Sequence, residues 1–254
     1  MIDVADYPTL LFVLASVALW LSARGGAFVR RRYPLDDEMR QDFSVLLGAS
    51  LTLLGLIIGF SFSMAAGRYD QRKNLEEAEA NAIGTEYLRA DLLPAAAAAK
   101  LRPLLKSYAQ QRILFYTIHD DRSLVEINAR TAKLQAEMWS AVLAPAAATP
   151  TPIVGLAVSG MNDVLNAQGY TQAAWWNRIP TSAWCLMVVI AICCNCLVGY
   201  GSRSASTASR LLYIFPLFIS VALAFIADID CPRHGIIRVH PQNLISLAGS
   251  LPAS

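Results

Sequence analysis

Four long stretches of the chain contain no Asp, Glu, Lys or Arg, and this pattern constrains the fold more than any other feature of the sequence. They cover residues 7–23, 43–67, 179–202 and 211–227. Each is long enough to cross the hydrocarbon core of a bilayer as a helix of about 17–25 residues. Charged residues make up 16% of the 254-residue chain, against roughly 25% in soluble proteins. We therefore predict an all-α membrane protein with four transmembrane helices.

A fifth uncharged stretch, residues 138–162, is predicted to be a linker between helices. Pro145, Pro150 and Pro152 lie within eight positions of one another. Prolines at this density break a helix and leave backbone groups unpaired in lipid, where water cannot satisfy them.

A helical soluble domain is predicted between the second and third spans. Residues 68–178 carry 23 of the 40 charges and show no β-strand pattern. The segment from 68 to 93 lacks proline and is rich in helix-forming residues, so we expect it to continue the second span as one helix from 43 to 93. The predicted organisation is a first membrane hairpin (1–67), the soluble domain (68–178), a second hairpin (179–227) and an irregular C-terminal tail (228–254).

Three further helices are predicted within the soluble domain from their start signals. Pro94 precedes a helix over 95–119, which has a second candidate start at Pro103. Ser123 and Glu126 have the spacing of a capping box that opens a helix to about residue 143. Thr151 and Pro152 form an N-cap and first-turn pair for a helix toward Trp176.

The distribution of basic residues leaves the orientation open. Basic loops stay in the cytoplasm, and the two loops opposite the soluble domain hold seven basic residues: Arg24, Arg30, Arg31, Arg32, Arg40, Arg203 and Arg210. The membrane-proximal ends of the domain and the tail hold six: Arg68, Arg72, Lys73, Arg178, Arg233 and Arg238. Only the weight given to the first loop favours an external domain.

The second span carries a strip of small residues on one helical face: Gly48, Thr52, Gly55, Gly59, Ser63 and Gly67. Such a strip allows another helix to approach closely, and the simplest interpretation is packing within one chain. The alternatives are an oligomer interface or a pore wall. An adjacent row of Leu54, Ile58 and Phe62 is a candidate hydrophobic constriction or a lipid-facing row. We therefore take Gly55, Ile58, Gly59, Phe62 and Ser63 as pore-lining or helix-packing candidates.

Two charged segments flank the membrane spans. Arg68 and Arg72 lie four residues apart after the second span. They are either boundary anchors or the lining of a vestibule that concentrates anions. Asp228, Asp230 and His234 follow the fourth span within seven residues. They form a candidate cation site or, more simply, a structural turn in which an aspartate pairs with an arginine, because their spacing matches no established metal motif.

The sequence offers no support for an enzyme or a cofactor. It contains no nucleophile elbow, Walker A sequence or HExxH motif. Four of the five cysteines lie within the third span, so neither a disulfide framework nor a metal site is indicated. No block of like charge suggests nucleic acid as a partner.

Two blocks of the sequence resemble the bacterial bestrophin-like membrane family. The first runs from Leu54 to Met64, continues through Arg68-Tyr69-Asp70-Gln71-Arg72 and ends at residues 79–85. The second is Asp228-Ile229-Asp230-Cys231-Pro232-Arg233-His234-Gly235, followed by Arg238, Val239 and Pro241. The resemblance extends over the whole chain.

The resemblance implies a function and an assembly. Bestrophins are pentameric anion channels with four spans per subunit, a helical domain after the second span and a pore lined by that span. Their acidic stretch after the fourth span is reduced here to Asp228 and Asp230, which weakens the case for calcium control. The family topology would place the helical domain in the cytoplasm.

Two functions follow as hypotheses. The first is an oligomeric anion channel in the bacterial inner membrane, a homo-oligomer with the second span lining the path. The second is a non-conducting sensor or scaffold whose helical domain binds a ligand or partner protein. The absence of ionisable residues from the four spans fits both, although it argues against a proton-coupled transporter.

Overall fold

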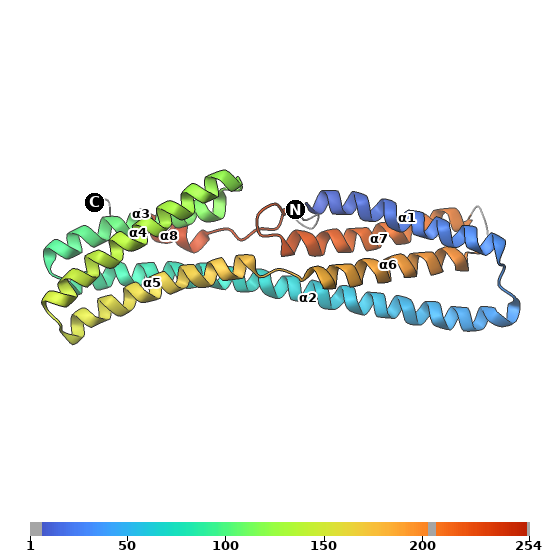
Figure 1. Cartoon of the computed structure of the whole chain (residues 1–254), viewed down its shortest axis with the longest axis horizontal. Helices are drawn as coiled ribbons and strands as arrows, with labels where there is room; N and C mark the ends of the chain where they lie inside the picture. The colour runs from blue at the N-terminus through green and yellow to red at the C-terminus, as the bar shows by residue number, and fades with distance from the viewer. Residues whose placement is uncertain (1–6, 203–206, 253–254) are drawn as a thin grey trace. The chain divides into compact units, whose positions relative to one another are not determined.

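The computed structural model describes residues 7–202 and 207–252, without the side chains of residues 37, 121 and 207–211. Every regular element in these ranges is a helix (Figure 1), which confirms the predicted all-α class. The elements are α1 (Pro8–Arg32), α2 (Asp37–Arg89), the short 3-10 helix η2 (Ala90–Leu92), α3 (Ala95–Thr117), α4 (Asp121–Ala148), α5 (Pro152–Trp176), α6 (Thr181–Gly201), α7 (Thr207–Asp230) and α8 (Gln242–Ser250).

Four helical segments are long and apolar enough to cross a membrane, as predicted. They are Pro8–Arg32, Glu38–Leu92, Pro152–Gly201 and Leu212–Asp230, the third of which contains both α5 and α6. The first helix is longer than its uncharged stretch, because α1 continues past residue 23 to its three terminal arginines. Arg203 and the side chain of Arg210, which contribute to the count of basic residues, lie outside the described residues.

The second span and the first helix of the soluble domain form one continuous helix, as predicted. α2 contains 53 residues, a length of about 80 Å at 1.5 Å per residue. No proline interrupts residues 37–89. The helix therefore passes from the uncharged segment into the charged one without a break.

The chain divides into two compact units. The first comprises Met1–Tyr69 and Arg178–Arg238. In it α1 packs against α6 and α7. The apolar part of α2 contributes Leu54 to a core with Leu19 and Ala191, and Ala65 to a second core with Ile226. This unit contains all four uncharged stretches.

The second unit comprises Asp70–Asn177 and Val239–Ser254. In it α3 packs against α4 and α8, and α4 packs against α5. Large side chains fill its interior, among them Tyr108, Phe115, Met138, Met161 and Trp175. The unit is a helical bundle, and it includes the C-terminal helix α8.

The helix starts in the second unit agree with the sequence at two positions and differ at one. α3 begins after Pro94 and keeps Pro103 inside it. α5 begins after Thr151, whose hydroxyl accepts the Val154 N–H at 3.3 Å. α4 begins one turn earlier than predicted, because the Asp120 carboxylate accepts the Ser123 N–H at 2.8 Å. The nearer acidic cap replaces the predicted Ser123 cap.

The C-terminal tail is not irregular throughout, which corrects the prediction. α8 (Gln242–Ser250) begins at a carboxylate supplied by a distant part of the chain. Glu76 accepts the Leu244 N–H at 2.9 Å and a hydrogen bond from the Asn243 amide at 2.6 Å. These contacts satisfy donors that a short helix leaves unpaired at its N-terminus. The helix thus depends on a cap that lies 168 residues away in sequence.

Candidate functional site

The small-residue strip of α2 faces away from the helices of its own unit. All six of its residues are exposed. A side chain added at Gly48, Gly55, Gly59 or Gly67 would meet nothing within 4 Å among the described residues. The opposite side of the helix is buried, with Leu54 at 1% and Ala65 at 0% exposure. The interpretation of the strip as packing within one chain is therefore wrong.

Close packing of helices within the chain occurs instead between α1 and α6. A side chain added at Gly26 would overlap the Cys196 carbonyl, and one added at Gly199 would overlap the Ala23 carbonyl. Both glycines are buried. The close contact of small residues that the sequence predicts for α2 is thus made by a different pair of helices.

The candidate residues of α2 divide between its two sides. Gly55, Gly59 and Ser63 lie on the exposed face. Ile58 packs against both apolar cores of its unit. Phe62 stacks on Phe225 of α7, with ring centroids 5.8 Å apart. Ile58 is therefore a helix-packing residue.

Two large apolar residues on the exposed side of α2 have no place in the sequence prediction. Leu56 is 52% exposed and Phe60 is 65% exposed. Leu56 follows Gly55 and Phe60 follows Gly59, so these two large residues alternate with small ones along the helix. The helical period alone does not show whether the row of Leu56 and Phe60 or the row of Leu54 and Ile58 is the exposed one. The packing of α2 against α1, α6 and α7 decides which row is free.

The arginines predicted to line a vestibule are not exposed. The Arg68 side chain is 15% exposed, and its NH1 lies 3.4 Å from Asp230 Oδ1. Arg72 is 1% exposed. A vestibule that concentrates anions needs guanidinium groups in contact with water. The burial of this pair and the contact of Arg68 with Asp230 therefore favour the alternative prediction, that of boundary anchors.

Asp230 connects three segments at one end of the first unit. Its carboxylate accepts the Ile179 N–H at 3.0 Å, faces Arg68 of α2, and lies 3.9 Å from Arg178 Nε. The side chain is 2% exposed. This contact joins the end of α7 to α2 and to the segment that precedes α6. Of the two interpretations of this region, these contacts favour the structural turn.

Asp228 and His234 belong to the same turn. Asp228 accepts the N–H groups of Ile236 and Ile237 at 2.6 and 2.8 Å. The His234 ring stacks on Tyr7 at 5.4 Å between centroids. No group of three or more His, Cys, Asp or Glu side chains suited to a metal ion occurs in residues 7–202 and 207–252. Both carboxylates are occupied by backbone N–H groups and arginines, so the arrangement does not favour a cation.

Comparison with models of known protein families identifies the family of this chain. A model of the family described as "Bestrophin-like domain" matches residues 9–244. The chain belongs to the bestrophin-like family. No curated protein matches it.

Solved structures of a bacterial bestrophin homologue from Klebsiella pneumoniae share the fold of this bestrophin-like chain. One is 16% identical, covers 96% of this chain and 99% of that one, and has a TM-score of 0.59. A substituted variant is 15% identical, with 94% and 97% coverage and a TM-score of 0.59. A second variant is 18% identical, with 98% and 100% coverage and a TM-score of 0.57. At these identities the likeness establishes the fold.

A buried ion pair connects helices in the second unit of this bestrophin-like chain, called the helical unit below. Arg112 of α3 pairs with Glu79 of α2, and both side chains are 0% exposed. Glu79 also accepts the Thr171 hydroxyl at 3.2 Å, which ties α5 to the same carboxylate. The Arg112 guanidinium lies 4.3 Å from the centre of the Phe115 ring. Three helices thus share one buried charged contact.

Another buried carboxyl, Glu86, lies two turns beyond Glu79 along the bestrophin-like α2. It is 0% exposed, and neither oxygen has a hydrogen-bond partner among the described residues. A side chain at Gly160 of α5 would overlap Glu86 Oε2 and Arg89 NH1. Burial raises the pKa of Glu86 from its ordinary 4.5 to about 8; the charge of Arg89 opposes the shift and that of Asp163 adds to it.

The raised pKa of Glu86 predicts a pH-dependent stability. The folded chain retains a proton that the unfolded chain releases above pH 4.5, so this group stabilises the fold fully below pH 4.5. The contribution falls by up to about 1.4 kcal/mol per pH unit until pH reaches the folded pKa near 8. We expect Glu86→Gln to raise the unfolding temperature at pH 8.5 and to leave it nearly unchanged at pH 4.5.

Thermal unfolding of the full chain in detergent checks this expectation. Glu77→Gln is the matched control, because Glu77 is exposed on the same helix, and it should shift neither temperature. An equal effect of Glu86→Gln at both pH values would contradict the assignment of a shifted carboxyl.

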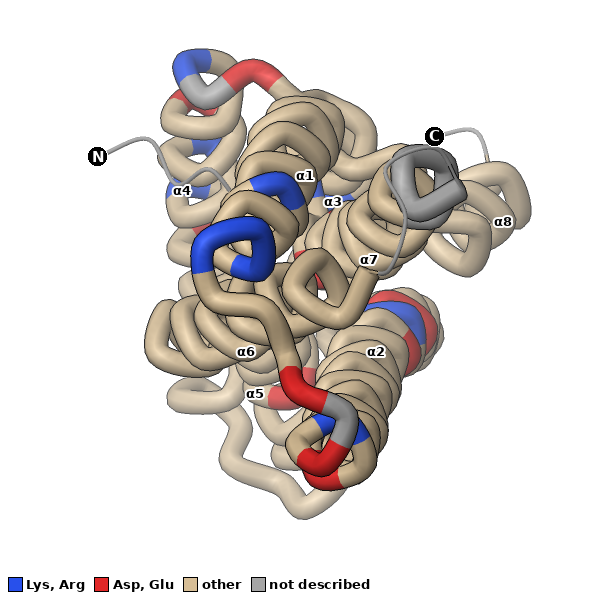
Figure 2. Tube along the Cα trace, turned by 90° about the vertical axis from the view of Figure 1, so that its right-hand side faces the viewer, with Lys and Arg blue, Asp and Glu red and all other residues tan. Residues whose placement is uncertain are grey.

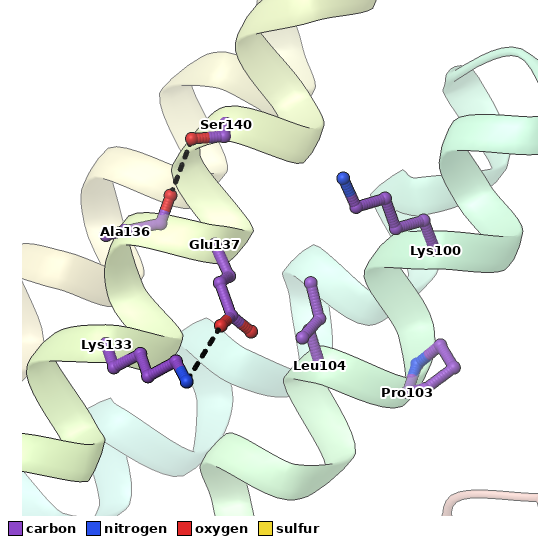
Figure 3. A pocket seen from close by; sticks show the side chains of 7 residues that line it. All are labelled: Lys100, Pro103, Leu104, Lys133, Ala136, Glu137 and Ser140. Carbon is purple, nitrogen blue, oxygen red and sulfur yellow. Dashed lines mark hydrogen bonds and ion pairs between the residues drawn. The ribbon is translucent and has the colours of Figure 1, made fainter.

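The helical unit of the bestrophin-like chain also has an open surface pocket of about 490 Å³ between α3 and α4. Its lining consists of Lys100, Pro103, Leu104, Lys133, Ala136, Glu137 and Ser140 (Figure 3). Lys133 lies 4.0 Å from Glu137, and the Ser140 hydroxyl donates to the Ala136 carbonyl. These polar groups are therefore partly engaged with one another.

Proposed function

We propose that the chain is a subunit of a homo-oligomeric channel for small ions, with the exposed face of α2 lining the path. The observation that carries the proposal is the strip from Gly48 to Gly67, which lies on a membrane-spanning helix and packs against nothing in its own chain. A face of this kind is free to contact a neighbouring subunit or to line a water-filled path, because the chain does not use it for its own packing. Membership of the bestrophin-like family supports anions as the ions, a pentamer as the assembly and the bacterial inner membrane as the location.

The chemistry of this face suits conduction without tight binding. Small side chains leave room along the helix, and the Thr52 hydroxyl donates to the Gly48 carbonyl at 2.9 Å. No ionisable side chain lies between residues 43 and 67, so a passing ion meets no fixed charge that would hold it. Leu56 and Phe60 are among the large apolar groups on the exposed side, and a ring of such groups forms a hydrophobic constriction.

Phe60→Ala should raise the ion current severalfold. Removing the phenyl group widens a constriction and lowers the cost of keeping it wet. The measurement is the current of purified protein in planar bilayers. Phe218→Ala is the matched control: Phe218 lies on α7 and is also 65% exposed, so the current should stay at the unsubstituted level.

The alternative function, a non-conducting sensor or scaffold, makes the opposite forecast. Correctly assembled protein would then be silent in bilayers both with and without Phe60→Ala. This result would leave the family assignment intact and remove the proposed channel.

A further inference from the structure

The first helix carries an apolar stripe that ends in arginines on the same face. Leu14, Val17 and Leu21 are 49%, 53% and 55% exposed, and Phe28 is 72% exposed. Spacings of three and four residues place them in one row along α1. Arg24 and Arg31 lie seven residues apart on the same face, where they flank Phe28 at the C-terminal end of the row.

The guanidinium groups at this end are not neutralised within the described part of the chain. Arg24 lies 5.4 Å from the centre of the Trp20 ring, and Arg30 donates to the Tyr200 carbonyl at 2.9 Å. Arg31 and Arg32 are exposed. The described residues place no carboxylate within 4.0 Å of any of these four arginines.

The nearby acidic residues lie on a different segment. Asp36 and Glu38 belong to the connection to α2 and its first turn, and both are exposed. Figure 2 shows the basic residues gathered at the end of α1 and the acidic ones on the segment that leads into α2. The positive charge at the end of α1 is therefore available to an external anion.

The spacing of the two arginines is a few ångströms larger than the depth of the polar layer of a membrane. The uncharged stretch ends at residue 23, so Arg24 lies at the edge of the hydrocarbon core. Seven residues of helix advance about 10 Å, whereas the headgroup region extends about 5–8 Å beyond the hydrocarbon on each side. Two long side chains, one at each limit, bracket a phosphate between them.

We propose that this face of α1 binds an anionic phospholipid. Its acyl chains lie along Leu14, Val17 and Leu21, and its phosphate is held between Arg24 and Arg31. Charge complementarity and the continuity of the apolar stripe with the arginines specify an amphiphile with a negative headgroup. The site is independent of whether the chain conducts ions.

Native mass spectrometry of the full chain in mild detergent tests the proposal. The protein is mixed with equal amounts of phosphatidylglycerol and phosphatidylcholine that have the same acyl chains. We expect phosphatidylglycerol to be retained preferentially, and Arg24→Gln/Arg31→Gln to lower the preference about tenfold or more. The control, Arg122→Gln/Arg130→Gln, removes two exposed arginines of α4 and should leave the preference unchanged.

Two further measurements complete the test. The first distinguishes loss of charge from misfolding of the variant, and the second distinguishes a bound lipid from free phosphate. Arg24→Lys/Arg31→Lys should keep the preference, because it retains both charges, and loss of the preference in this variant would overturn the proposal. Excess inorganic phosphate should not displace the lipid, and displacement would assign the site to a free anion. Equal retention of the two lipids by the unsubstituted chain would also overturn the proposal.

Discussion

Arg112→Met should destabilise the helical unit by about 3–5 kcal/mol, the usual cost of removing one partner of a buried ion pair. The Glu79 carboxylate would remain in a core where both side chains are 0% exposed. The Thr171 hydroxyl is one polar partner that it would keep. Trp175 lies in the same core, 4.8 Å from Phe115 between ring centroids, so tryptophan fluorescence during chemical unfolding in detergent reports the change.

A matched substitution and a double variant make this prediction specific. Arg130 is exposed on α4, and Arg130→Met should change stability by no more than about 0.5 kcal/mol. Glu79→Leu/Arg112→Met removes both charges and should recover most of the loss. Equal unfolding midpoints for Arg112→Met and Arg130→Met would contradict the importance of the pair.

Gly199→Ala should destabilise the first unit by about 3 kcal/mol, at the upper end of the usual cost of overpacking. The added methyl group would overlap the Ala23 carbonyl of α1. A backbone carbonyl within a helix cannot rotate away as a side chain can, so α6 and α1 must separate. Thermal unfolding in detergent, followed by circular dichroism, measures the effect.

Gly55→Ala is the natural comparison for Gly199→Ala. A methyl group at Gly55 meets nothing within 4 Å among the described residues, and alanine favours a helix interior over glycine by up to about 1 kcal/mol. We expect unchanged or slightly increased stability. If Gly199→Ala were as harmless as Gly55→Ala, the close approach of α1 and α6 would be wrong.

The membrane helices could be predicted from the sequence because each requires a long run without charge. Lipid cannot satisfy an exposed backbone, so these runs become helices with little dependence on tertiary contacts. The continuity of α2 followed from the absence of proline between residues 35 and 93. Thr151 was predictable as a cap because an N-cap acts on the backbone three residues away.

The features missed by the sequence prediction all depend on distant contacts. Glu76 caps α8 from 168 residues away, and no local pattern links the two. The predicted pairing of an aspartate with an arginine is made by Asp230 and Arg68, but the sequence could not identify which two residues would meet. The strip on α2 was correctly grouped on one face, but the direction of this face is set by the packing of α1, α6 and α7. Leu56 and Phe60 could be identified only after that direction was known.

The central claim, that the exposed face of α2 lines an ion path, is tested most directly by charge introduced at Ser63. In a background with Cys185 and Cys193 replaced by serine, Ser63→Cys is treated with a negatively charged thiol reagent while current is recorded in a planar bilayer. Leu217→Cys, on the exposed side of α7, is the control. The account predicts that modification changes the current through Ser63→Cys and leaves that through Leu217→Cys unchanged. Complete modification of Ser63→Cys, verified by mass, with no change in current would contradict it.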